Sequence, residues 1–259
     1  MLSLALHGEK IFIPEYYRGI KVFTAEGTAS KHILIQDKNF VLVSGDIEAV
    51  GDNILFLTCV WDGKVKDSKL AAVFIDTAGD VKEKVVGYPR EYSQFLLTGR
   101  KCGAIRGDCT FAVCFAQSPA LIIGSLKEKN QKLIDCVDRQ KLYISPKRRA
   151  DSGGNEQEMW KLLKEEWLNY RIVFLNDTLI ARARCRETDE SIRLKSLVLR
   201  QNSLDIFTLT GHFLGEVQLP GRLHDACQDL LFIEESDAPE NRQFGFYKIT
   251  FQLQLANAQ

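Results

Sequence analysis

The chain has 259 residues, and 34 Lys and Arg are balanced by 34 Asp and Glu, so its formal net charge is zero. Without a basic excess it is not expected to bind nucleic acid. No apolar stretch approaches the length of a membrane-spanning helix, so no membrane span is expected. Hydrophobic residues at 45% and charged residues at 26% are ordinary for a globular domain.

A short pattern returns along the chain: a small or polar residue, an acidic residue, then alternating apolar residues. It reads GEKIFI from Gly8, GDNILFL from Gly51, GDCTFAV from Gly107, NDTLIA from Asn176 and QDLLFI from Gln228. The acidic residue suits a tight turn, and the alternating run predicts a half-buried strand. The five copies are therefore interpreted as five equivalent hairpins.

A second element follows several copies, as IKVFTAEG from Ile20, AVFIDTAG from Ala72 and LDIFTLTG from Leu204. Its terminal glycine predicts a further hairpin turn, so each unit makes three or four antiparallel strands. One such sheet cannot bury both faces, but several stacked around an axis can. Repeats of roughly 40 to 70 residues that are mostly strand favour a propeller. A β-sandwich has evenly spaced strands but no repeating unit of several strands.

The fold class predicted is therefore all-β: a β-propeller of five to six blades, with residues 1–259 forming a single domain. Five units are readable. The ring either has five blades, or has a sixth blade that is assembled from the two ends of the chain or has diverged between the third and fourth copies. The sequence leaves these blade numbers open.

Residues 143–171 do not repeat. Their first part, SPKRRADSGG, has the composition of a loop, and NEQEMWKLLKEEWLNY then predicts one inserted helix near 155–170 with Asn155 as N-cap. Met159, Trp160 and Trp167 fall on one helical face. This helix is expected either to pack on the rim of its own propeller or to act as a lid or partner-binding element.

Seven cysteines are present, and the odd count means that they cannot all pair within the chain. No pair has the C-x₂-C spacing of a zinc knuckle, so free, buried cysteines are expected. Free cysteines favour a reducing, cytoplasmic location. The opening MLSLAL is too short for a signal peptide. However, the chain starts within a pattern, which leaves open a missing N-terminal segment and an exported protein or lipoprotein.

Catalytic motifs such as G-x-S-x-G, H-E-x-x-H and the phosphate-binding loops are absent from the sequence. The four histidines are scattered and do not form a metal-ligand set, so neither a cofactor nor a metal is expected. Aromatic and charged residues instead gather where the strands after the acidic turns end, which in a propeller is one shared rim. The expected binding residues are Tyr16, Tyr17, Arg18, Trp61, Asp62, Arg184, Arg186 and Glu234.

The stretches GEKIFIPEYYRGIKVFTAEG and LDIFTLTGHFLGEVQLPG resemble blades of bacterial six-bladed β-propeller proteins of the NHL/TolB-like type. The resemblance covers most of residues 1–90 and 170–255. It implies a six-bladed ring and, as in many members, export or lipid anchoring; it assigns no catalytic residue.

The function predicted is a non-enzymatic binding or assembly scaffold that uses one rim for a protein, peptide or carbohydrate ligand. An enzyme is less expected because no convergent carboxylates with distinct roles can be placed. The alternatives are a lactonase-like propeller hydrolase with an axial metal ion, and a sugar- or peptide-sensing propeller of an exported system.

Overall fold

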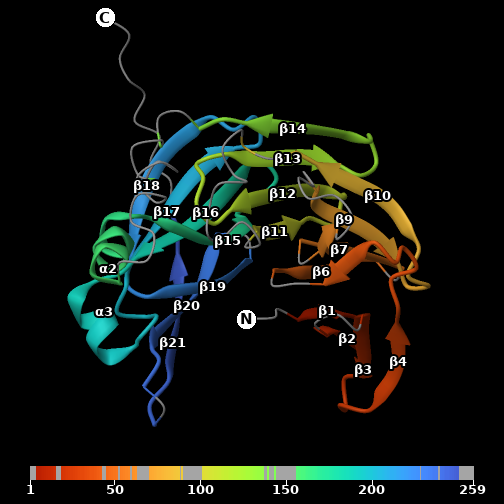
Figure 1. Cartoon of the computed structure of the whole chain (residues 1–259), viewed down its shortest axis with the longest axis horizontal. Coiled ribbons are helices and arrows are strands. Elements are labelled where there is room, and N and C mark those ends of the chain that lie inside the picture. Colours follow the sequence, from red (N-terminus) through yellow and green to blue (C-terminus); the bar gives the residue numbers. More distant parts are fainter. Residues whose placement is uncertain are drawn as a thin grey trace, which may run out of the picture.

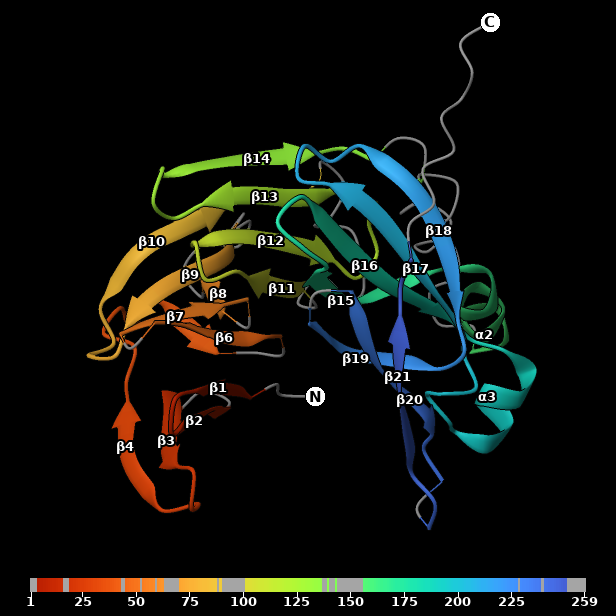
Figure 2. The same ribbon diagram turned by 180° about the vertical axis from the view of Figure 1, so that it is seen from behind.

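The computed structural model describes residues 4–15, 19–42, 45–51, 53–58, 60–62, 70–87, 89, 101–136, 139, 143, 156–227, 229–238 and 240–250. Five antiparallel sheets stand side by side around a common centre, as blades of a propeller (Figures 1 and 2). The predicted all-β propeller with five to six blades is therefore confirmed.

The blades follow one another along the chain, and each runs from an innermost strand outward. Blade 1 contains β1 (Ala5–His7), β2 (Lys10–Glu15), β3 (Gly19–Thr24) and β4 (Ala29–Ile33). Blade 2 contains β6 (Ile47–Val50), β7 (Ile54–Leu57), β9 (Leu70–Asp76) and β10 (Val81–Val86), and β5 (Phe40–Leu42) pairs with β8 (Val60–Asp62) beside it. Blade 3 contains β11 (Lys101–Ile105), β12 (Thr110–Phe115), β13 (Leu121–Ser125) and β14 (Asn130–Ile134).

Blade 4 contains β15 (Leu168–Phe174), β16 (Leu179–Arg186), β17 (Gln201–Thr208) and β18 (Phe213–Leu219). Blade 5 has three strands in the described part of the chain: β19 (Arg222–Cys227), β20 (Leu230–Ser236) and β21 (Gln243–Lys248). Over the residues that the structure describes, blade 5 thus has one strand fewer than the other four.

The repeated acidic turns join the innermost strand of each blade to the second strand. Gly8 and Gly51 adopt positive φ angles of 57° and 60° in two of these turns, a conformation that glycine reaches without strain. Asp108 accepts a hydrogen bond from the Thr110 backbone N–H at 2.9 Å in the third. The strand after each turn is the second strand of its blade, because the strand before the turn takes the innermost position.

Each pair of consecutive blades shares one cluster of buried apolar side chains. Between blades 2 and 3, for example, Phe56, Phe74 and Phe111 pack with ring centres 4.8 to 5.7 Å apart. The alternation of apolar residues along the second and third strands supplies both faces of a blade. These four clusters are the core of the protein.

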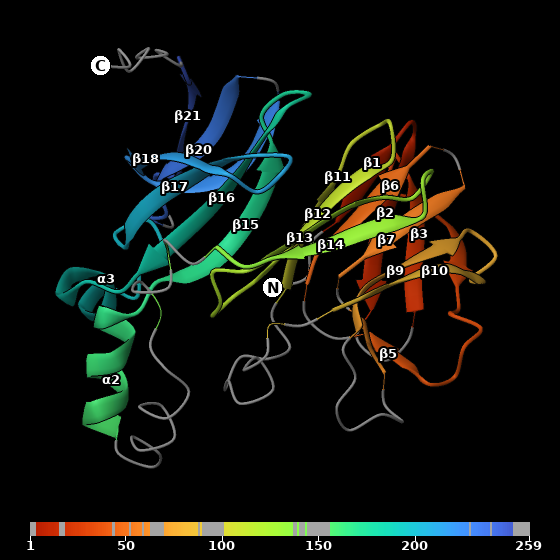
Figure 3. The same ribbon diagram turned by 90° about the horizontal axis from the view of Figure 1, so that it is seen from above.

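The inserted helix is α2 (Glu156–Glu165), which is shorter than the predicted 155–170, and Asn155 lies outside the described residues. The chain leaves the helix early because Leu168 begins the innermost strand of blade 4. A second helix, α3 (Asp189–Leu194), was not predicted; Thr188 and Ser191 form its capping box. Both helices lie at the end of blade 4 where β16 terminates (Figure 3). Neither described helix meets the length and hydropathy needed to cross a bilayer.

Six cysteines fall in the described part of the chain, and all six are free thiols; Cys59 lies outside it. Cys102, Cys114, Cys136 and Cys185 are buried, as expected for cysteines that act as small apolar residues.

Candidate functional site

The predicted rim residues lie in several separate places. Tyr16, Tyr17 and Arg18 fall outside the described residues. Trp61 and Asp62 belong to β8, where they pair with Val41 and Phe40 of β5, but their side chains are outside the described part. Arg184 and Arg186 lie on β16, whereas Glu234 lies on β20.

Arg184 belongs to a buried network of three arginines around Asp205. Asp205 and Arg182 have no exposed surface, and Arg184 is 1% exposed. Arg182 Nη2 donates to Asp205 Oδ2 at 2.9 Å, and Arg184 Nε donates to Asp205 Oδ1 at 3.1 Å. Arg139, which follows blade 3 in the chain, donates from Nη2 to both Asp205 and Glu216 at 2.7 Å.

The network connects elements rather than opening to solvent. Arg182 also donates to the Pro119 carbonyl of blade 3, so it joins blades 3 and 4. Arg186 is half-buried, and its Nε donates to Gln201 Oε1 at 2.6 Å. Since ions inside a protein lose their hydration, three arginines there depend on the carboxylates that face them. Arg184, one of the predicted binding residues, is therefore buried and bonded within this network.

A second charged cluster lies between the innermost strands, near the centre of the ring. Arg171 of β15 approaches Asp46 at 3.5 Å and Asp225 of β19 at 3.5 Å. Asp46 Oδ2 also accepts the backbone N–H of Gly103 at 3.0 Å. Burial raises the pKa of the neighbouring Glu48 to about 7, although Arg171 opposes this rise. Among the described residues, these carboxylates do not form a metal-ligand group.

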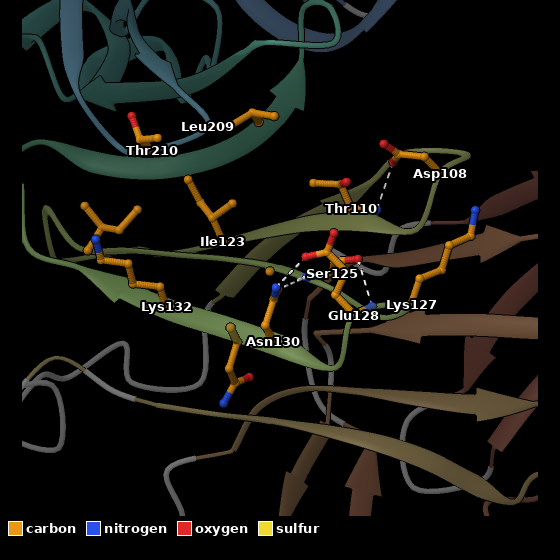
Figure 4. A pocket seen from close by; sticks show the side chains of 13 residues that line it. Asp108, Thr110, Ile123, Ser125, Lys127, Glu128, Asn130, Lys132, Leu209 and Thr210 are labelled. Carbon is orange, nitrogen blue, oxygen red and sulfur yellow. Dashed lines mark hydrogen bonds between the residues drawn. The ribbon is translucent and has the colours of Figure 1, made fainter.

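A cavity of about 630 Å³ lies on the outer side of blades 3 and 4 (Figure 4). Its polar groups are largely bonded to one another. Asn130 donates its amide to Glu128 and accepts the Ser125 backbone N–H at 3.1 Å, while Asp108 accepts from Thr110. The remaining lining includes the apolar Ile123, Ile134 and Leu209. The cavity could hold a small polar molecule, but these groups do not converge on one point.

The face of blade 5 that points away from blade 4 carries an exposed aromatic cluster. Phe232 and Phe244 stack with ring centres 5.1 Å apart, and Phe246 lies 5.2 Å from Phe232. Phe244 is 45% exposed and Phe246 is 75% exposed. We call Phe232, Phe244 and Phe246 the aromatic face. Large exposed apolar patches on soluble domains mark interaction sites.

Polar side chains flank the aromatic face. His224 Nε2 lies 2.7 Å from Glu234 Oε2, and the His224 ring meets Phe244 edge-on at 5.6 Å. Glu234 is only 2% exposed, and Arg242 approaches its other oxygen at 3.6 Å. Of the predicted binding residues, Glu234 is thus placed beside the aromatic face, under His224 rather than on the surface.

Sequence reasoning missed the aromatic face, although a signal was present. Phe244 and Phe246 alternate in the last strand, and their pairing partners are Glu234 and Phe232. The same alternation in blades 1 to 4 indicates residues that are covered by the next blade. Only the structure shows that no described element covers them here.

No family model matches the chain, and neither does any curated protein sequence. Among solved structures, hydrazine synthase of Kuenenia stuttgartiensis aligns with TM-score 0.51 and 10% identity over 96% of this chain and 62% of that one. The WD40 repeats of RRP9 align with TM-score 0.50 and 10% identity over 90% of this chain and 58% of that one. A DUF4221 family member from Bacteroides vulgatus aligns with TM-score 0.40 and 10% identity over 96% and 92%.

At these identities, the alignments bear on the fold alone. The chain spans about three fifths of the hydrazine synthase and RRP9 chains that it matches. Together with the arrangement of its sheets, the alignments show that the chain is a β-propeller with five blades in its described part.

Proposed function

We propose that this protein is a non-enzymatic scaffold that binds a protein partner through the aromatic face of blade 5. The observation that supports the proposal is the exposure of Phe244 and Phe246 on a regular strand. Aromatic side chains are enriched among the residues that carry most of the energy of protein interfaces. The complete assembly is proposed to be a six-bladed ring of the NHL/TolB-like type.

A protein is favoured over a carbohydrate or a short peptide because the aromatic face lies on one side of a β-sheet and not in a pocket. The cavity described above lies on blades 3 and 4, away from it. The predicted rim around Tyr16, Trp61 and Arg186 is proposed as a second contact. Arg184 is assigned to support, since it is buried.

The test compares the tagged protein purified from its own cells with the double variant Phe244→Ser, Phe246→Ser. The native protein should elute with a partner, and its complex should exceed the mass of one chain by native mass spectrometry. The double variant should lose that partner, since interface anchors of this kind contribute about 2 kcal/mol or more each.

The matched control is Leu133→Ser, Leu214→Ser, which removes two exposed apolar side chains (42% and 51% exposed) from blades 3 and 4. The control should retain the partner. Equal retention by the native protein and the double variant, both folded by circular dichroism, would refute the proposed surface.

A further inference from the structure

The third strand of each blade presents alternate residues to the blade that follows. In blades 1 to 4 these residues are buried: Val22, Phe74, Leu121 and Leu204 are each 3% exposed or less. Their counterparts on β21 are Phe244 and Phe246, because the opposite side of blade 5 already packs on blade 4 through Leu231 and Ile233. The aromatic face thus has the position of an interblade core, but no described blade packs against it.

Blade 1 has a similar uncovered face. Ala5 and Phe12, which pair across β1 and β2, pack toward blade 2. The residues next to Ala5 in the chain therefore point to the opposite face of the blade. Leu4 is 55% exposed and Leu6 is 68% exposed on that side. None of the four interblade clusters, which comprise described residues, joins blade 1 to blade 5. The two blades stand apart in Figures 1 and 2.

The chemistry of these faces indicates what covers them. The charges around the aromatic face are mixed: Lys248 lies 3.3 Å from Asp229, and Arg242 is near Glu234. Among the described residues around this face, neither sign is in excess to attract a nucleic acid or a highly charged peptide. The exposed groups are those that fill the cores between blades, which are formed by one sheet packing on another.

We propose that a β-sheet of a separate partner protein inserts between blades 5 and 1 as the sixth blade of the ring. One face of that sheet packs on Phe232, Phe244 and Phe246, and its other face packs on Leu4 and Leu6. This inference rests on the proposed function and specifies its partner.

A second copy of this chain is the principal alternative occupant. Blade 5 of one copy could contact blade 1 of another. Such a head-to-tail contact, however, adds further copies in a filament unless the rotation between copies closes a ring. A single inserted sheet instead covers both faces at once and leaves no further apolar face open.

The test is site-specific photo-cross-linking of the full chain in its own cells. Benzoyl-phenylalanine is placed at position 246, at position 6, or at the control position 133 on β14 of blade 3. We expect positions 246 and 6 to cross-link to the same partner polypeptide and position 133 to give no such adduct. The cross-linked peptides of the partner should lie in strands of one sheet.

The outcomes separate this inference from the proposed function. Cross-linking of a partner at position 246 but not at position 6, or of two different partners, leaves a binding protein and refutes the inserted sheet. Adducts twice the mass of this chain assign both faces to self-association and refute it too. Absence of adducts at both positions refutes the proposed function itself.

Discussion

The Arg184 guanidinium lies over the indole of Trp167, with its Cζ atom 3.9 Å from the ring centre. Trp167 is 6% exposed and comes from the segment between helix α2 and blade 4. Arg184 Nη1 has no hydrogen-bond partner among the described residues, and the stacked ring gives the cation a favourable electrostatic contact. A side chain that sequence reasoning placed at a binding rim therefore holds the insertion against the propeller.

Asp205 is predicted to be indispensable for stability. Asp205→Asn removes the carboxylate that faces Arg182 and leaves Arg139 and Arg184 with Glu216, so the free energy of unfolding should fall by about 3–5 kcal/mol, as when one partner of a buried ion pair is removed. Urea denaturation followed by circular dichroism measures this. Asp177→Asn, at a side chain that is 97% exposed, should change stability little. Similar losses for both variants would contradict a special role for Asp205.

Glu48 is predicted to make stability depend on pH. Its folded pKa of about 7 lies above its ordinary value of 4.5, so the folded protein binds the extra proton between these values. This contribution is complete below pH 4.5 and is lost as the pH rises through about 7. Glu48→Gln should therefore match the native protein in acid and exceed its stability by up to roughly 3 kcal/mol at about pH 8.

Urea midpoints across this pH range measure the effect, with the exposed Glu240→Gln as the control. A constant difference between Glu48→Gln and the native protein at every pH would show that Glu48 does not titrate in this range.

Gly103 is predicted to be required for close packing of blades 2 and 3. A Cβ atom at this position would lie 2.4 Å from Thr58 Cγ2 and 2.7 Å from Phe56 Cε1. Gly103→Ala should therefore cost about 1–3 kcal/mol by overpacking. Gly107→Ala is the control, since nothing lies within 4 Å of its added carbon. The melting temperatures of both variants test this. An unchanged melting temperature for Gly103→Ala would mean that Thr58 and Phe56 move aside without cost.

The cysteines are predicted to differ in reactivity. The hydrogen bond to Cys114, together with burial, raises the pKa of Cys102, so its thiolate is scarce. Cys227 is exposed and should be alkylated first in the native protein, while Cys102 and Cys114 should react only after unfolding. Peptide mass spectrometry after timed alkylation gives the order. Under denaturing, non-reducing conditions all seven thiols should titrate, and recovery of five or fewer would reveal a disulfide.

The repeat pattern predicted the five hairpins because turn chemistry and strand alternation are local properties. It did not identify the innermost strands, since Ala5–His7 has only 3 residues and Arg222–Cys227, with 6, carries no strong alternation. Helix α2 was extended too far because Trp167 continues the helical spacing, yet pairing of Leu168 with Cys185 in the sheet prevails.

The candidate sites were harder to predict than the fold. Arg182, Arg184 and Arg186 alternate with Ala181, Ala183 and Cys185, which places three arginines on one face of a strand. That pattern is compatible with a solvated face, and it becomes a buried network only when Asp205 lies opposite Arg182 in the sheet. Likewise, Phe244 and Phe246 alternate as core residues do, and only the arrangement of blades shows that they are uncovered.

Arg171 has a consequence for how the molecule unfolds. Repeat proteins whose units contact only their neighbours can lose those units one at a time from either end. Arg171 instead ties blade 4 to Asp46 at the entrance of blade 2 as well as to Asp225 in blade 5, and Asp46 binds the backbone of blade 3. Detaching any of these four blades therefore breaks a contact of Arg171 or Asp46. The central cluster therefore favours unfolding of blades 2 to 5 as one cooperative unit, with blade 1 the sheet most able to open alone.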